Sequence, residues 1–229
     1  MSHLLSLAAS SFPEFIFRGG TALARAYWPD FRLSEDLDFI SEHPVSDFQQ
    51  RLEAVVAEAA QATGRDLTIE SSTLRSGWWQ SIVVWAGGTT KLDVNTNERA
   101  HLPASQRKLE LPYSDLSTHG RELAVVAVEE ILGNKWFILD DRWEPRDLFD
   151  VWWGLARAGI TFAELADGHR AKYGYGPQRI PARAARRLKS AWDQRLAHQL
   201  RELPEFDGVL AEVTEAYDAW SGRRRDDRT

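Results

Sequence analysis

The segment RGGTALARAYWPDFRLSEDLDF, residues 18–39, decides the fold because it joins two strand-like runs through a Gly-Gly turn and a short helix. The run FIFR before the glycines and the run LDFI at the end have the apolar content of strands, and TALARAYW between them has helical apolar spacing. Side chains alternate between the two faces of a strand, so Asp36 and Asp38 are predicted to point the same way. The segment therefore predicts a sheet that carries a pair of carboxylates on one face.

The composition places the chain among globular proteins. It has 229 residues, of which 43% are hydrophobic, enough for one large domain or two small ones. The absence of cysteine excludes disulfides and cysteine-based zinc sites, and it fits the cytoplasmic location that we expect. No apolar run approaches the roughly 20 residues that span a bilayer, so no membrane partner is expected. The opening MSHLLSLAAS lacks a basic start and is interpreted as a first helix, not a signal peptide.

The rest of the chain separates into a strand-rich part and a helical part. A helix ending near Thr63 and closed by Gly64 precedes three strand-like runs at 67–72, 80–86 and 90–95, the last two joined by a Gly-Gly hairpin turn. After residue 122 the pattern is helical. The predicted helices lie at 128–142, 145–159, 162–173, 178–200 and 205–221. We expect an α/β (α+β) fold with a mixed, partly antiparallel sheet, flanking helices and a helical C-terminal part, divided into domains 1–115 and 116–229.

The pair Asp36 and Asp38 has two interpretations. Two carboxylates so close repel each other, and a magnesium ion would relieve the repulsion because hard divalent ions prefer carboxylate oxygen. Solvated surface pairs of this kind are also common. The preceding RGGT also has two interpretations. Its glycines would allow backbone N–H groups to approach a phosphate, but Gly-Gly pairs also occur in ordinary tight turns.

A third acid, Asp93, follows the hairpin turn in TKLDVN. Lys91, Asp93 and Asn95 share one face of the predicted strand. An acid inside a hairpin strand is disfavoured unless it faces water or a ligand. Asp93 is thus either a third member of the carboxylate cluster or part of an exposed strand face.

Charged residues also occur within the apolar C-terminal helices. Lys135 lies in VEEILGNKWFIL, and Arg146, Asp147 and Asp150 follow a short turn. Asp150 stands among aromatic residues, where an unpaired carboxylate is costly. Lys135 or Arg146 is its expected partner, and a structural ion pair between adjacent helices is the alternative to a role in chemistry.

Positive charge is concentrated between residues 169 and 195. Eight basic side chains there face one acid, Asp193, a balance of +7, although the whole chain carries −6. The segment is either a solvated helix face or a contact surface for a polyanion.

Taken together, RGGTALARAY, RLSEDLDF, KLDV, EEILGNK and PRDLFDVW resemble the nucleotidyltransferase toxins of the AbiEii/AbiGii family, including the mycobacterial MenT group, within the polymerase-β-like nucleotidyltransferase superfamily. The resemblance covers about residues 18–153. It implies a nucleotidyltransferase sheet in the domain 1–115, with the domain 116–229 completing the active site and contacting the acceptor.

The resemblance implies the following site. Asp36, Asp38 and Asp93 hold Mg²⁺, with Mn²⁺ as an alternative, and Asp93 also helps to activate the attacking hydroxyl. A second group of residues binds the nucleoside triphosphate substrate, and Asp147 supports Lys135 within that group. These nucleotide-binding residues are Gly19, Gly20, Thr21, Ser34, Lys135 and Arg146.

The resemblance further implies that the chain transfers a nucleoside monophosphate to RNA, with the tRNA 3′ end as leading acceptor, and so blocks translation until a cognate antitoxin acts. Residues 169–195 are the expected RNA surface, with Tyr173 and Tyr175 stacking on bases. Phosphorylation of Ser34 by a kinase-like antitoxin would add negative charge beside the carboxylates and block nucleotide binding. Alternatives are transfer to a small molecule or a protein hydroxyl, and a non-catalytic toxin that only binds the nucleotide.

Overall fold

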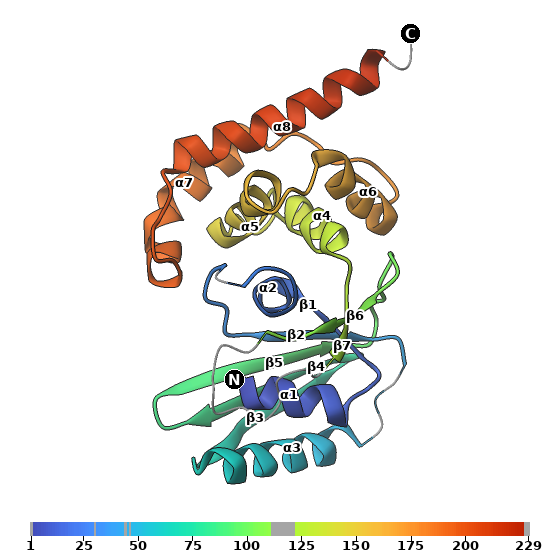
Figure 1. The fold of residues 1–229 in the computed structure, drawn as a ribbon, viewed down its shortest axis with the longest axis vertical. Coiled ribbons are helices and arrows are strands. Elements are labelled where there is room, and N and C mark those ends of the chain that lie inside the picture. The colour runs from blue at the N-terminus through green and yellow to red at the C-terminus, as the bar shows by residue number, and fades with distance from the viewer. Residues whose placement is uncertain (1, 30, 44, 46, 111–121, 227–229) are drawn as a thin grey trace. The chain divides into compact units, whose positions relative to one another are not determined.

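The computed structural model describes residues 2–29, 31–43, 45, 47–110 and 122–226. The chain divides into two compact units, residues 1–126 and 127–229. The domain boundary expected between residues 115 and 116 lies outside the described residues. Each unit is described separately below, and both are drawn in Figure 1.

The first unit is built on a seven-stranded sheet of order β3-β4-β5-β2-β1-β7-β6. β1 pairs with β7, and β2 with β5, in parallel, whereas the other neighbours are antiparallel. The mixed, partly antiparallel sheet predicted from the sequence is thus confirmed. The strands are β1 Phe15–Arg18, β2 Leu37–Ser41, β3 Leu67–Arg75, β4 Trp78–Trp85, β5 Gly88–Asn95, β6 Ser105–Lys108 and β7 Glu122–Val125.

Helices cover both faces of this sheet (Figure 1). Helices α1, Ser2–Ser11, and α3, Phe48–Thr63, lie on one face, and α2, Gly19–Ala22, lies on the other. The core beneath α1 and α3 is aromatic. The rings of Phe12 and Phe15 stack at 4.5 Å, and Phe15 packs 5.2 Å from Phe39 on β2. These large buried side chains fix which face of β1 and β2 is apolar, and therefore which face carries the acids.

Two local features follow the sequence closely. Gly64 adopts a left-handed conformation with φ of 62° and caps α3, as its position after Thr63 predicts. The helix expected over TALARAYW is present, but only its start is α-helical. It continues as a π-helical turn, η1, over Leu23–Tyr27, a geometry that periodicity alone does not distinguish from an α-helix.

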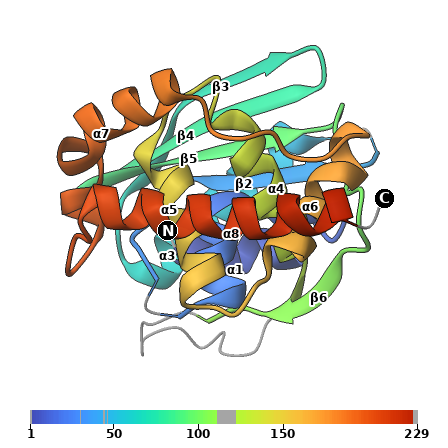
Figure 2. The ribbon, with the colours of Figure 1, turned by 90° about the horizontal axis from the view of Figure 1, so that it is seen from above.

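The second unit is helical, as predicted. Its helices are α4 Val128–Ile138, α5 Pro145–Ala156, α6 Phe162–Tyr173, α7 Ala182–Leu196 and α8 Phe206–Asp226, with a short 3₁₀ turn, η2, over Ala197–Gln199. α4 packs on α5 and α6, and Figure 2 shows α8 running across α5 and α6.

Close packing of α4 on α6 depends on glycine. A Cβ atom on Gly168 would lie 2.1 Å from the backbone oxygen of Glu129, and one on Gly133 would lie 2.4 Å from the backbone nitrogen of His169. No other residue type allows the two backbones to approach so closely. Within the described residues, no helix is long and apolar enough to cross a membrane.

Candidate active site

A row of polar side chains crosses the middle of the sheet in the first unit. Register pairs place Arg18 on β1 opposite Asp38 on β2, Asp38 opposite Asp93 on β5, and Asp93 opposite Gln80 on β4. Residues that face each other across paired strands project from the same face of the sheet. The structure therefore brings two of the three predicted carboxylates, Asp38 and Asp93, to neighbouring positions, although 55 residues of sequence separate them.

Asp36 stands just before β2 and is held by the glycine turn. The Thr21 hydroxyl donates a hydrogen bond to the backbone oxygen of Asp36. It also lies 2.8 Å from the Ser34 hydroxyl, in a second hydrogen bond. Thr21 thus ties the segment Ser34–Asp36 to the start of α2, and its hydroxyl joins three of the predicted site residues.

The two glycines let this turn touch the carboxylate row. Gly19 has φ of 78°, and a Cβ atom there would lie 2.5 Å from Asp38 Oδ2. A Cβ on Gly20 would lie 3.1 Å from Ser34 Oγ. The sequence left open whether the Gly-Gly pair is only a tight turn, and in the structure its backbone is in direct reach of the acids.

Negative charge in the row is only partly balanced. Burial raises the pKa of Asp38, and the nearby charges of Asp93 and Asp36 raise it further, against the opposing influence of Arg18 and Lys91. The ionised row is therefore under repulsion, the state that the sequence predicted for this cluster.

Asp93 already has partners. Lys91 Nζ lies 2.6 Å from Asp93 Oδ2, and Gln80 Nε2 donates to Asp93 Oδ1 at 3.1 Å. Burial lowers the pKa of Lys91, but the bond to Asp93 and the charges of Asp36 and Asp38 outweigh it and raise the pKa. Across the described part of the chain, no three His, Asp or Glu side chains stand in ready metal-ligating geometry.

Three residues near this site, Arg18, Gln80 and Glu98, were not predicted from the sequence. Arg18 pairs with Glu98, and Gln80 holds Asp93. The alternation of Phe15 and Phe17 into the core does place Arg18 on the acidic face. Its position opposite Asp38 depends on strand register, which the sequence does not reveal.

A cavity of about 790 Å³ borders the same region of the first unit. Its walls include Ser34, Glu35, Arg25 and the hairpin turn at Gly87 and Gly88. Its volume falls within the range of small-molecule sites, roughly 300–1,000 Å³. Ser34 therefore belongs both to the hydrogen bonds of the turn and to the wall of this cavity.

In the second unit, Lys135 is enclosed between two aspartates. Its ammonium lies 2.9 Å from Asp147 Oδ1 and 2.7 Å from Asp150 Oδ2, and both aspartates are fully buried. Arg142 binds the other oxygen of Asp147 at 2.7 Å. Burial raises the pKa of Asp147, but the positive charges of Lys135 and Arg142 outweigh it and hold the pKa below its usual value.

This arrangement identifies Lys135 as a partner of Asp150. Of the two cations considered from the sequence, Lys135 makes the contact, whereas Arg146 lies 4.0 Å from Glu144. Lys135 also donates a hydrogen bond to Asp147 Oδ1 at 2.9 Å, and the role of Asp147 in supporting Lys135 during the reaction stays a prediction. The two interpretations of these charged residues, a structural ion pair and a role in the chemistry, therefore concern the same contact of Lys135 with the aspartates.

Much of the basic charge in residues 169–195 is locally balanced. Arg179 pairs with Asp218, Arg183 with Asp140 and Lys189 with Asp207. A further pair joins Arg170 and Asp167. All are exposed, and exposed pairs contribute only about 0–1 kcal/mol each, so a phosphate can replace the acid at little cost.

Comparison with known proteins agrees with this fold. The family model for the nucleotidyl transferase AbiEii toxin of type IV toxin–antitoxin systems matches residues 3–219. MenT4, a nucleotidyltransferase toxin from Mycobacterium tuberculosis H37Rv, is similar in structure, with a TM-score of 0.65, 18% identity and coverage of 94% of this chain and 79% of its own. JHP933 from Helicobacter pylori gives a TM-score of 0.63 at 16% identity, covering 99% of this chain and 93% of its own.

A search of curated proteins found no match. The two similar structures share the fold with this chain, and the family model covers nearly all of it. The chain belongs to the AbiEii family of nucleotidyl transferase toxins of type IV toxin–antitoxin systems.

Proposed function

We propose that the chain uses a divalent metal to transfer a nucleoside monophosphate from a nucleoside triphosphate to RNA, with the tRNA 3′ end as the leading acceptor, and so blocks translation. The observation that carries the proposal is the row of Asp38 and Asp93 beside Asp36, in direct reach of the glycine turn. Carboxylates held under repulsion at a backbone turn suit a bound cation and the phosphates it accompanies.

The donor set fits Mg²⁺, or Mn²⁺ as an alternative. Asp36, Asp38 and Asp93 offer hard oxygen atoms, and burial, followed by the charges of Asp93 and Asp36, raises the pKa of Asp38, so a bound cation would favour its ionised form. A bound divalent ion would neutralise the charge of the triphosphate and of the leaving pyrophosphate. Lys91 currently balances Asp93 at 2.6 Å, so it must leave Asp93 Oδ2 before that oxygen can act as a ligand.

The chain's own residues then position the reactants. The residues Gly19, Gly20 and Thr21 are assigned to the β- and γ-phosphates, through their backbone N–H groups. Asp93 accepts the proton of the acceptor hydroxyl, whose oxygen bonds to the α-phosphorus while the bond from that phosphorus to the bridging oxygen of pyrophosphate breaks. Positioning and charge neutralisation supply most of the catalysis in such reactions.

The second unit is proposed to complete the active site and to contact the acceptor, within the domain 116–229. Lys135 and Arg146 are assigned to the triphosphate and Asp147 to the support of Lys135. The charges of Lys135, Arg142, Asp147 and Asp150 sum to zero, so Lys135 can act on a phosphate only if its bonds to the aspartates loosen.

Regulation by a cognate antitoxin and a cytoplasmic location complete the proposal. A phosphate on Ser34 would stand beside Thr21 and the backbone of Asp36, where it would add about −1.5 to −2 charge to a row already under repulsion. We expect Ser34→Glu to lose transfer activity while Ser34→Ala keeps most of it. Full activity of Ser34→Glu would remove Ser34 phosphorylation as the control.

The test is incubation with each labelled nucleoside triphosphate, Mg²⁺ and total tRNA, alongside small hydroxyl compounds and protein as acceptors. Wild type should label RNA, and Asp36→Asn should lose at least about 10²-fold in rate because the charge that binds the metal is gone. Leu74→Ala, an exposed change on β3, is the matched control. Label found only in protein or in a small molecule would show that RNA is not the acceptor. Growth inhibition by Asp36→Ala would favour a toxin that only binds the nucleotide.

A further inference from the structure

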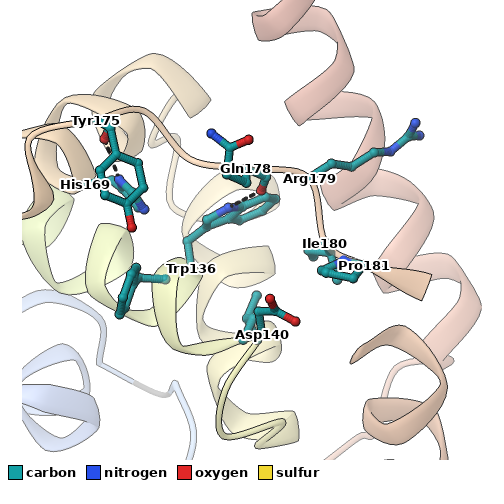
Figure 3. Close-up of a pocket in the computed structure, with 10 residues that line it drawn as sticks. Trp136, Asp140, His169, Tyr175, Gln178, Arg179, Ile180 and Pro181 are labelled. Atoms are coloured by element: carbon teal, nitrogen blue, oxygen red, sulfur yellow. Dashed lines mark hydrogen bonds between the residues drawn. The ribbon is translucent and has the colours of Figure 1, made fainter. Parts of the chain in front are cut away.

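A small aromatic pocket lies within the second unit, between α4, α6 and the segment that joins α6 to α7. Figure 3 shows it, with Trp136 and Asp140 on one side, His169 and Tyr175 on another, and the connecting segment Gln178–Pro181 along its edge. The Arg179 side chain extends away from the pocket, towards α8, where it pairs with Asp218. No step of the proposed chemistry uses this pocket.

The pocket exposes apolar rings to solvent. The described residues contain four large hydrophobic side chains that are classed as exposed, Leu33, Leu74, Phe137 and Tyr175, and two of these, Phe137 at 39% and Tyr175 at 49%, line this one pocket. Exposed rings gathered at a concave site indicate a ligand that stacks.

The structure also separates the two tyrosines that the sequence proposed for stacking. The ring of Tyr173 is stacked at 3.9 Å on Phe137, and its hydroxyl donates to Asn134 at 2.6 Å. Tyr175 keeps nearly half of its surface exposed and meets His169 edge-on at 5.4 Å. Tyr175 is therefore the ring positioned to receive a ligand, and Tyr173 supports the wall.

Two side chains of the pocket offer hydrogen-bond acceptors. His169 is buried, and its Nδ1 lies 2.9 Å from the backbone oxygen of Tyr175. A carbonyl oxygen only accepts, so Nδ1 carries the proton. Burial also lowers the pKa of His169, which keeps the ring neutral and leaves Nε2 with a lone pair. The Asp140 carboxylate on the lining is the second acceptor; both of its oxygens now accept from Arg183, at 2.9 Å and 3.0 Å, and they become available to a base when a phosphate draws Arg183 away.

The pocket is sized for one ring system. Its volume is about 160 Å³, below the roughly 300–1,000 Å³ of sites that enclose a whole drug-sized ligand. A single planar group would fit, with the rest of the ligand outside. The surrounding segment carries Arg183 and Arg179 in exposed ion pairs that phosphates can displace.

We propose that this pocket takes one unstacked nucleobase of a single-stranded RNA, with the neighbouring phosphates on the basic segment 169–195. The proposal deepens the proposed function and rests on RNA as the acceptor. Single-stranded RNA is recognised by bases that splay out, stack on aromatic rings and bond through their edges. Because the pocket offers acceptors, it selects cytosine or adenine, whose amino groups supply two donors, over uracil.

The test measures binding separately from transfer. Fluorescence anisotropy with 5′-labelled hexamers of C, A and U should show weaker binding of U by wild type. Tyr175→Ala should weaken binding of C and A hexamers about 10-fold, as expected for one lost stacking contact. Leu74→Ala, an exposed change on β3 of the first unit, should bind as wild type does. Asp140→Asn, a surface change that should leave folding intact, should narrow the difference between C and U.

The possible outcomes distinguish failure of the pocket proposal from failure of the proposed function. Tyr175→Ala binding within twofold of wild type, together with an unchanged KM for RNA in the transfer assay, would overturn the pocket and leave the transferase standing. Tyr175-dependent binding without RNA labelling would keep the pocket and overturn RNA as the acceptor. Equal affinity for CMP and the C hexamer would make this a free-nucleotide site, and no RNA binding at all would overturn both.

Discussion

The two units treat buried carboxylates in opposite ways. In the first unit, the pKa of Asp38 is raised by burial and by the charges of Asp93 and Asp36. In the second, burial acts on Asp147 in the same direction, but Lys135 and Arg142 overcome it and lower the pKa. Burial is common to both sites, so the difference lies in how many cations each unit supplies.

The two clusters also differ in net charge. In the second unit, Lys135 and Arg142 both pair with Asp147, Lys135 also pairs with Asp150, and the charges of these four groups sum to zero. The row in the first unit has three acids, with Lys91 bonded to Asp93 and Arg18 engaged by Glu98. The row in the first unit therefore carries excess negative charge, whereas the cluster in the second unit is balanced by its own cations.

Removal of Lys135 should have the largest effect on stability. Lys135→Ala leaves Asp147 and Asp150 buried with one fewer cation, and breaking a buried pair in this way costs about 3–5 kcal/mol. Urea unfolding followed by circular dichroism measures the loss. The matched control is Lys189→Ala, which breaks the exposed pair with Asp207 and should cost about 0–1 kcal/mol. Equal losses in the two variants would mean that the Lys135 cluster is not desolvated in solution.

Addition of a divalent cation should stabilise the first unit by a smaller amount. At a concentration ten times its Kd, Mg²⁺ that binds only the folded state adds about 1.4 kcal/mol. The rise in Tm with Mg²⁺ should be lost in Asp36→Asn and kept in Lys189→Ala, whose change lies in the other unit. A rise of the same size in Asp36→Asn would place the ion elsewhere.

The sequence predicted most of the secondary structure for local reasons. Phe15–Arg18 is a strand, Gly64 caps a helix and 162–173 is helical, as alternation, capping and periodicity indicated. The fold class followed from these elements, and the family resemblance was confirmed by the family model.

The contacts within each site could not be predicted in the same way. The position of Asp38 opposite Asp93 depends on parallel pairing of β2 with β5, and no local pattern encodes that register. The contacts of Lys135 could not be predicted either. The helical pattern places Lys135 among apolar residues, but it does not reveal that both Asp147 and Asp150 contact its ammonium group. The assignment of these residues to metal and nucleotide remains a prediction.

Neutralising Asp38 should stabilise the metal-free protein. Asp38→Asn removes a charge that the folded state disfavours, and we expect a gain of about 1 kcal/mol, or about 3 °C in Tm, at pH 7. Transfer activity should fall at the same time, which separates stability from function. The isosteric change Asp147→Asn is the matched control in the other unit, and it should lower Tm because it removes a carboxylate that two cations stabilise. A fall in Tm for Asp38→Asn would show that Arg18 and Lys91 already compensate this carboxylate.

The pH dependence of these two carboxylates is the finest test of the comparison. The pKa of Asp38 is raised above the ordinary 3.8, so the folded state holds its proton more tightly, and stability falls as pH rises from that value through the folded pKa. The pKa of Asp147 is lowered from 3.8, so its contribution to stability is present above that value and is lost as pH falls through the folded pKa.

The advantage in stability of Asp38→Asn over wild type should therefore vanish below about pH 4. The deficit of Asp147→Asn should persist to lower pH before it disappears. Carboxyl-carbon NMR titration should show Asp38 gaining its proton before Asp147 as pH falls, and the reverse order would mean that the two units do not differ in the charge they supply.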